Sequence, residues 1–185
     1  MIISNRRLFF DLYRENIDAN HVITNSEVKS IDELIDLINN SSDIFTKSQW
    51  AYFLATLFHE TNGTLEPVIE AYWLSEEWRK KNLRYYPYYG RGFVQITWLK
   101  NYQIFSKLLG IDLVKKPGLA CNKEISFKIA VMGMKKGLFT GKKISDYVNE
   151  MKCDYVSARK VINGTDKQSL VAKYAELFLN ILSKM

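Results

Sequence analysis

The chain contains few of the residues that build disulfide-linked or metal-bound scaffolds. Its 185 residues include two cysteines, Cys121 and Cys153, two histidines and three scattered prolines. Two cysteines are too few for a disulfide framework and lack metal-ligand spacing, which indicates synthesis in a reducing compartment. The sequence has no internal repeat, low-complexity tract or linker rich in proline, glycine or serine. We therefore expect a single domain over residues 1–185.

Long apolar runs are missing as well. The first residues, Met-Ile-Ile-Ser-Asn-Arg-Arg, are polar where a secretory signal would be apolar, and no stretch is long enough to span a bilayer. We therefore expect no signal peptide. Hydrophobic residues make up 47% and charged residues 25% of the chain, which is typical of a globular protein and too apolar for disorder.

The net charge of +6 is unevenly distributed along the sequence. Residues 1–78 hold 5 basic and 13 acidic side chains, whereas residues 79–185 hold 21 basic and 7 acidic ones. A basic second half indicates a polyanionic partner such as nucleic acid, anionic lipid or bacterial cell wall. Solvated lysines that keep the protein soluble are an equally supported interpretation.

Helical periodicity dominates the chain and predicts a mainly α fold. One helix is predicted after Ser4 as N-cap, and a second after Ser30, which would form a capping box with Glu33. Three more are predicted before Gly110, before Gly137 and at the end of the chain. The apolar residues that define these three helices are Tyr102, Phe105, Leu108, Leu109; Ile125, Ile129, Met132; and Leu170, Tyr174, Leu177, Phe178, Ile181.

One predicted helix carries a carboxyl group on its apolar face. Thr46 and Gln49 form a capping box, and an apolar stripe follows at helical spacing: Trp50, Phe53, Leu54, Leu57, Phe58. Glu60 continues that face at the carboxyl end. Against aromatic rings its pKa would rise, and it could then act as a general acid. Periodicity alone favours a terminal glutamate that is solvated or paired with lysine. His59 lacks a partner at position 63, which excludes the metalloprotease motif.

The segment Gly90–Trp98 is rich in β-branched and aromatic residues and predicts a small β element. Strict alternation would place Phe93, Gln95 and Thr97 on one face, with Val94, Ile96 and Trp98 on the other. One face would then belong to the core, and the other could line a groove.

Glycosidic hydrolysis needs a second carboxylate or a group that positions water, roughly 6.5 to 9.5 Å from the first in inverting enzymes. Candidates after Glu60 are Glu66, Glu70, Glu76 and Glu77, each of which alone fits a surface charge. The Asn62-Gly63-Thr64 turn signal allows the chain to reverse between Glu60 and this cluster. Glu70 has the least polar neighbours.

Aromatic residues are dense just beyond these glutamates, without clear helical or strand periodicity. Such rings can stack on sugars and bind their hydroxyls, or can equally form a small core under a loop. They are Tyr72, Trp73, Trp78, Tyr85, Tyr86, Tyr88 and Tyr89.

Three separated motifs in the right order resemble the family 19 glycoside hydrolases, which include chitinases and, nearest in pattern, bacteriophage endolysins. The first lies between Ala51 and Tyr102 and contains AYFLATLFHET, EAYWLSEEW and YYGRGFVQITWLKNY. The others are DLVKKPGLA at residues 112–120 and ARKVING at residues 158–164. This resemblance implies a mainly α, lysozyme-like domain with two lobes, a small β element beside the cleft, and inverting hydrolysis.

The resemblance also implies roles for individual residues. Glu60 corresponds to the catalytic acid, and the endolysin-like spacing makes Glu70 the second carboxylate, with Glu77 as the alternative base. The plant chitinase spacing would fall near Asn82, so it does not transfer. The predicted water-binding and substrate-binding residues are Thr97, Gln95, Asn101, Tyr72, Arg91 and Asn163. Asn163 also fits a helix C-cap beside Gly164.

These observations lead to a functional hypothesis of a phage or prophage endolysin that cleaves bacterial peptidoglycan. We expect no cofactor, no metal, no separate cell-wall-binding domain and a monomer that contacts the anionic envelope through its basic half. It would be made in the host cytoplasm and released by a holin. A chitinase is the nearest alternative. A non-catalytic protein that binds cell wall or nucleic acid is the alternative from another class, but it would not require the His-Glu-Thr and Gly-Arg-Gly motifs; we therefore expect no nucleic-acid partner.

Overall fold

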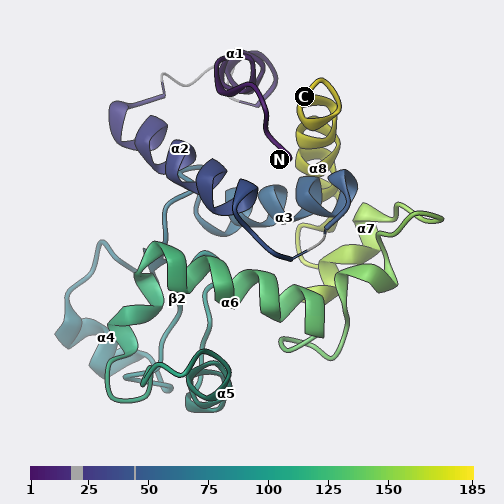
Figure 1. Cartoon of the computed structure of the whole chain (residues 1–185). Coiled ribbons are helices and arrows are strands. Elements are labelled where there is room, and N and C mark those ends of the chain that lie inside the picture. Colours follow the sequence, from purple (N-terminus) through teal and green to yellow (C-terminus); the bar gives the residue numbers. More distant parts are fainter. Residues whose placement is uncertain (18–22, 44) are drawn as a thin grey trace. The chain divides into compact units, whose positions relative to one another are not determined.

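The computed structural model describes residues 1–17, 23–43 and 45–185 and confirms a mainly helical fold (Figure 1). The chain forms two compact units. The large unit comprises Met1–Leu65 and Val131–Met185, and the small unit comprises Glu66–Ala130.

The large unit consists of helices. They are α1 (Arg6–Asn16), α2 (Asn25–Asn39), α3 (Lys47–Glu60), the 3-10 helix η2 (Ile144–Asp146), α7 (Tyr155–Ala158), the 3-10 helix η3 (Arg159–Val161) and α8 (Gln168–Ser183). Helix α8 packs against α1, α3 and α7, most extensively against α3. Buried rings fill this core; Tyr13 lies 6.2 Å from Phe178, and Phe58 lies 4.9 Å from Tyr174, between ring centroids.

Helix α3 is more deeply buried than its apolar stripe predicts. All nine residues from Gln49 to Leu57 are buried, including Tyr52 and Thr56 on a row that continues to Glu60. The predicted capping box is confirmed, because the Gln49 N–H donates to the Thr46 hydroxyl and the Thr46 N–H donates to the Gln49 side chain. Helix α3 is therefore a central element that presents Glu60 at its carboxyl end.

Two other predicted caps are wrong. The side chain of Asn5, rather than Ser4, accepts the Leu8 N–H at the start of α1. Helix α2 begins earlier than predicted, with a capping box of Thr24 and Glu27. Ser30 lies inside this helix, where it is buried and donates a 2.9 Å hydrogen bond to the Leu65 carbonyl oxygen.

The small unit combines short helices with a minimal sheet. Its elements are β1 (Val68–Ile69), α4 (Glu76–Asn82), β2 (Arg91–Gly92), α5 (Leu99–Leu109) and the 3-10 helix η1 (Pro117–Cys121). Helix α6 (Lys123–Lys136) begins in this unit and ends in the large one. The antiparallel strands pair Val68 with Gly92 and Ile69 with Arg91.

The β element predicted over residues 90–98 exists, but it is much shorter than predicted. After Gly92 the chain turns, and an isolated bridge pairs Ile96 with Arg91. The alternation of faces is wrong because φ is positive at Gln95, at 51°, and the turn buries Phe93, Val94 and Ile96 together. Trp98, with a φ of 74°, is 46% exposed.

Helix α4 has a local signal that periodicity did not reveal. Ser75 accepts the Trp78 N–H, acidic residues occupy the first turn, and basic residues occupy the last turn. This charge order complements the helix dipole. Across the described ranges, every helix is too short or too polar to cross a bilayer.

Candidate functional site

The two expected carboxylates belong to different units, with Glu60 in the large unit and Glu70 in the small unit. Glu70 directly follows β1, and its backbone N–H donates to the Gly90 carbonyl oxygen at 2.8 Å. One carboxylate oxygen of Glu70 accepts the Gly90 N–H at 2.8 Å, and the other accepts the Tyr85 hydroxyl at 2.6 Å. Burial, followed by the hydrogen bond to Glu70, raises the pKa of Tyr85 to about 12, so this phenol is a donor at neutral pH.

Gln95 lies beside Glu70. Gly90 has no side chain, but a Cβ atom added to it would lie 2.7 Å from Gln95 Oε1 and 3.1 Å from Glu70 Oε2, so both side chains border the same point. The amide nitrogen of Gln95 donates to the carbonyl oxygens of Val68 and Gly92, at 2.8 Å each. These bonds fix the amide, so that its oxygen faces the same small space as the carboxylate.

Thr97 and Asn101 extend this arrangement along the turn into α5. The Thr97 hydroxyl donates to the Gln95 carbonyl oxygen at 3.0 Å, and the Asn101 side chain donates to the Thr97 carbonyl oxygen at 2.7 Å. Both side chains are half-buried. The structure thus links three of the predicted residues, Gln95, Thr97 and Asn101, in one hydrogen-bonded chain.

The backbone around these residues is strained. Ala71, immediately after Glu70, has a φ of 50°, and Gln95 and Trp98 also lie in the left-handed region. Non-glycine residues rarely adopt positive φ, and such strain is concentrated at functional sites. The strain therefore supports a site built around Glu70, independently of its hydrogen bonds.

Three other predicted residues of the small unit have different environments. Arg91 is only 5% exposed, and its guanidinium donates to the Pro87 and Tyr89 carbonyl oxygens and the Tyr102 hydroxyl. These bonds hold the guanidinium inside the small unit, and its substrate-binding role stays a prediction. Tyr72 is exposed and contacts Trp73 edge to face. Glu77 is exposed on the first turn of α4, where hydrogen bonds from its own backbone and from Ser75 lower the pKa of its carboxyl.

Glu60 in the large unit is held by an arginine that is distant in sequence. Glu60 Oε1 lies 2.6 Å from a terminal guanidinium nitrogen of Arg159, and the two side chains are 17% and 2% exposed, respectively. Arg159 Nε also donates to the Asp166 carbonyl oxygen at 2.8 Å. The sequence left open whether Glu60 lies against aromatic rings, is solvated or pairs with lysine; in the structure its partner is the buried cation Arg159.

The remaining predicted residues of the large unit lie near this pair in sequence. Asn163 is exposed, four residues after Arg159, and its N–H donates to the Arg159 carbonyl oxygen. His59 is half-buried, and burial is the main cause that lowers its pKa. Its neutral form is therefore favoured, and it is not a standing cation beside Glu60.

Sequence reasoning missed Arg159, Tyr85 and Gly90 as partners of the two carboxylates. Arg159 lies within the ARKVING motif, where only Asn163 was selected, and Tyr85 was one of many aromatic residues. The sequence separations of 99 between Arg159 and Glu60 and of 15 between Tyr85 and Glu70 leave no periodic signal.

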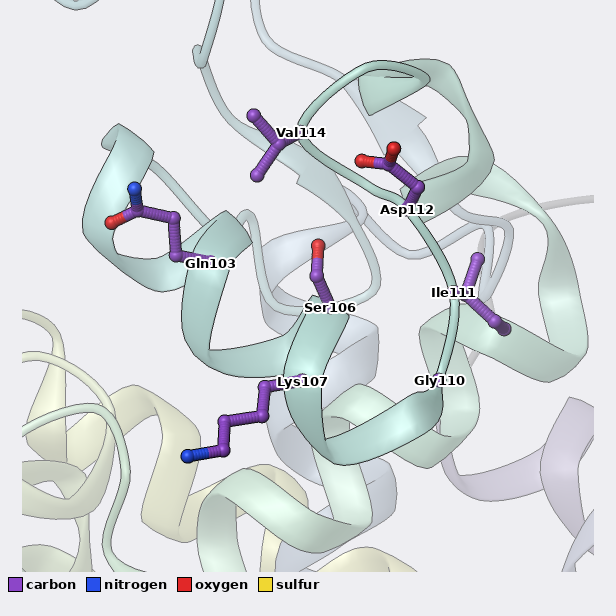
Figure 2. A pocket seen from close by; sticks show the side chains of 7 residues that line it. All are labelled: Gln103, Ser106, Lys107, Gly110, Ile111, Asp112 and Val114. Carbon is purple, nitrogen blue, oxygen red and sulfur yellow. The ribbon is translucent and has the colours of Figure 1, made fainter.

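Neither Glu60 nor Glu70 lines the two pockets described next. A pocket of about 410 Å³ in the small unit lies between α5 and the following loop, and none of the predicted site residues lines it (Figure 2). Its lining consists of Gln103, Ser106, Lys107, Gly110, Ile111, Asp112 and Val114. A pocket of about 380 Å³ in the large unit is lined by Phe58, His59, Asn62, Gly63, Leu170 and Tyr174.

His21 lies outside the described residues, among which no cluster of three His, Cys, Asp or Glu side chains could hold a metal ion.

Comparisons with known proteins agree with the motifs. Residues 45–137, half of the chain, match the family model of class I chitinases, glycoside hydrolase family 19. Chitinase 8 of Oryza sativa subsp. japonica is 35% identical over 95 residues, which cover 49% of this chain and 36% of the rice protein. The Inactive chitinase-like protein 1 of Hevea brasiliensis is 47% identical over 45 residues, 24% of this chain and 14% of that protein. The chain thus spans well under half the length of these relatives.

The fold is shared with a solved bacterial structure. Chitinase C from Streptomyces griseus superimposes with a TM-score of 0.61 at 19% identity, covering 98% of this chain and 77% of that one. The matched family region also contains both Glu60 and Glu70. The chain belongs to the class I chitinase family, glycoside hydrolase family 19.

Proposed function

We propose that the chain hydrolyses β-1,4 glycosidic bonds in a polysaccharide of N-acetylated amino sugars. The observation that carries this proposal is the family match over residues 45–137, which includes both carboxylates. The geometry supports it further, because Glu60 and Glu70 are each held by a strong donor that selects one orientation of the carboxyl group.

In this proposal Glu60 protonates the glycosidic oxygen as the bond breaks. Glu70, together with Thr97, orients a water molecule and accepts its proton as the water attacks the anomeric carbon from the opposite face. The Tyr85 and Gly90 donors keep the Glu70 carboxylate aimed, and Gln95 is placed to bind the substrate or the water. The product would have the inverted anomeric configuration.

Chitin is the first substrate to test, because several relatives carry names of chitinases. Peptidoglycan is the second candidate, and charge favours it. The small unit holds 11 basic and 6 acidic side chains, and a cationic surface attracts an anionic wall more strongly than a neutral polymer. If peptidoglycan is the substrate, we propose the biological role of an endolysin released by a holin.

The first prediction concerns the carboxylates. Glu60→Gln should fold normally and lose about 10² to 10⁴ in kcat, since it removes the proton donor. Glu70→Gln should also be strongly impaired, whereas Glu77→Gln should remain active. Glu150→Gln, an exposed glutamate of the large unit, is the matched control. Activity is measured as sugar release from colloidal chitin and as turbidity loss of purified peptidoglycan.

The results separate the alternatives clearly. Near-normal cleavage by Glu60→Gln would overturn the assignment of the acid, and loss of activity in Glu77→Gln rather than Glu70→Gln would move the base to Glu77. Cleavage of one polymer and not the other identifies the substrate. Binding to both polymers without cleavage would indicate a non-catalytic protein, as the name of the inactive Hevea brasiliensis relative illustrates.

A further inference from the structure

A partly exposed tryptophan follows directly after Thr97 in the small unit. Trp98 is 46% exposed, and its φ of 74° lies in a region that non-glycine residues seldom adopt. Its backbone N–H donates to the Tyr88 carbonyl oxygen at 2.8 Å, which helps to hold this conformation. Such strain is concentrated at functional sites. The chain thus fixes an accessible indole ring beside a residue that is predicted to bind water.

The indole ring is connected to Glu70 through one phenol. The Tyr85 ring meets the Trp98 ring at 5.1 Å between centroids, with an interplanar angle of 62°. The hydroxyl of the same tyrosine donates to the Glu70 carboxylate at 2.6 Å. One side chain therefore contacts both the expected base and the exposed ring.

An arginine lies over this ring. The guanidinium carbon of Arg84 is 5.0 Å from the Trp98 ring centroid. Arg84 is exposed, and it forms no ion pair with the described part of the chain. The charges of Arg84 and Glu70 act in opposite directions on the pKa of the Tyr85 phenol, so both lie near it. Arg84 is therefore an available cation close to the expected base.

This pair of side chains suits a sugar that carries a negative charge. The hydroxyl and acetamide groups of a neutral amino sugar need aromatic rings and neutral hydrogen-bonding groups rather than a cation. A ligand carboxylate near Glu70 would be repelled unless a positive charge offset the repulsion. A guanidinium can bind a carboxylate through two parallel N–H groups while it stacks on an aromatic ring. Arg84 and Trp98 together offer both contacts.

We propose that Arg84 and Trp98 form a specificity subsite that binds a carboxylate of the substrate, with the indole against the sugar ring and the guanidinium on the carboxylate. This inference rests on the proposed hydrolytic function, and it names the chemical group that distinguishes peptidoglycan from chitin. Peptidoglycan offers this carboxylate from two sources. One is the lactyl group of muramic acid when the peptide has been removed, and the other is the stem peptide when it is present.

The second prediction compares soluble glycan strands that differ only in charge. Strands of peptidoglycan with and without stem peptides are prepared, and a portion of each is coupled to methylamine, which neutralises the carboxylates. The wild type should show a kcat/KM about 3-fold to 10-fold higher on charged than on neutralised strands, as for a charge-assisted hydrogen bond at an exposed site. Arg84→Gln should lower kcat/KM on the charged strands and bring this ratio to about one.

Lys107→Gln is the matched control for a change of charge. Lys107 is an exposed cation of the same unit, about 13 Å from Trp98 along the axis of α5, so its replacement should leave the ratio unchanged. Trp98→Ala should lower the ratio as Arg84→Gln does and should also raise KM on neutralised strands, because the sugar ring loses its stacking partner. An equal fall of the ratio in Lys107→Gln would assign the preference to the general positive field and overturn the subsite.

The two kinds of strand identify the source of the carboxylate. A preference that depends on Arg84 in peptide-free strands supports the lactyl carboxylate, and one found only in peptide-bearing strands supports a carboxylate of the stem peptide. A wild-type ratio of about one on both kinds of strand would overturn the proposal.

Calorimetry tests the subsite without cleavage. The probes are tetrasaccharides of alternating N-acetylglucosamine and N-acetylmuramic acid, with and without stem peptides, each compared with its methylamide. The Kd of the wild type should be several-fold lower for the charged member of at least one pair, and Arg84→Gln should lose this difference. If the wild type cleaves no strand, the hydrolytic function fails while this measurement still decides whether Arg84 binds a carboxylate. Equal Kd values within both pairs would overturn the subsite.

Discussion

At the scale of residues, Gly90 determines whether Glu70 and Gln95 can share one space. Its N–H binds one carboxylate oxygen, and its missing side chain leaves room for the other two groups. Any Cβ at this position would meet the Gln95 amide oxygen at 2.7 Å, a contact that real Cβ atoms essentially never show. The glycine is thus part of the construction of the site.

The third prediction follows from this contact. Gly90→Ala should displace the Gln95 amide and the Glu70 carboxylate, and kcat should fall about 10²-fold, the cost of a misplacement of about 1 Å. Gly118→Ala is the control, because its Cβ would meet no atom within 4 Å. Steady-state kinetics with circular dichroism would check both, and full activity in Gly90→Ala would mean that Glu70 is not held in this way during catalysis.

The sequence predicted the candidate site unevenly at this scale. Motifs selected Glu60, Glu70, Gln95, Thr97 and Asn101, and the structure links the last three. The sequence did not predict the hydrogen-bond partners of Glu60 and Glu70. Arg159 and Tyr85 are brought to these carboxylates only by tertiary folding. For Arg91 the motif did not reveal the partners either, because its guanidinium donates to the Pro87 and Tyr89 carbonyl oxygens through tertiary folding.

At the scale of elements, helices were predictable because their burial repeats with a regular period. Helices α3, α5, α6 and α8 occur where the apolar stripes predict them. The true extent of the strand expected over residues 90–98 was not predictable. Apolar alternation cannot show that Gln95 adopts a positive φ and turns the chain. Helix caps were predicted only in part. Thr46 is the N-cap of α3 as predicted, whereas Ser30, a residue type common at N-caps, lies inside α2.

The fourth prediction concerns the cap of α3. Thr46→Ala removes the acceptor of the Gln49 N–H and should lower the free energy of unfolding by about 1 kcal/mol, whereas Thr46→Ser keeps the cap. Because Glu60 lies at the opposite end of the helix, kcat of the folded enzyme should be unchanged. Urea denaturation measures the stability, and equal losses in both variants would show that the threonine methyl group, rather than the cap, matters.

At the scale of the whole molecule, the charge asymmetry of the sequence does not survive folding. The large unit joins the acidic amino-terminal segment to the basic carboxyl-terminal one and holds 15 basic and 14 acidic side chains. Lys135 pairs with Asp43 at 2.6 Å, and Arg159 pairs with Glu60, both across these two segments. The positive excess resides mainly in the small unit, which carries Glu70, so the basic second half of the sequence is divided between two units of different net charge.

The fifth prediction uses this location to separate the two substrates. If an anionic wall is attracted to the small unit, raising sodium chloride from about 0.05 M to about 0.5 M should markedly lower kcat/KM on peptidoglycan, because the Debye length shrinks from over 10 Å to under 5 Å. Cleavage of neutral chitin oligosaccharides under the same conditions is the control and should change little. Equal losses on both substrates would place the salt effect on the protein itself, and no loss on either would remove charge as a reason to prefer peptidoglycan. Lys80→Gln with Lys81→Gln, on the exposed surface of α4, should reduce the salt dependence on peptidoglycan without changing the rate on the neutral oligosaccharide.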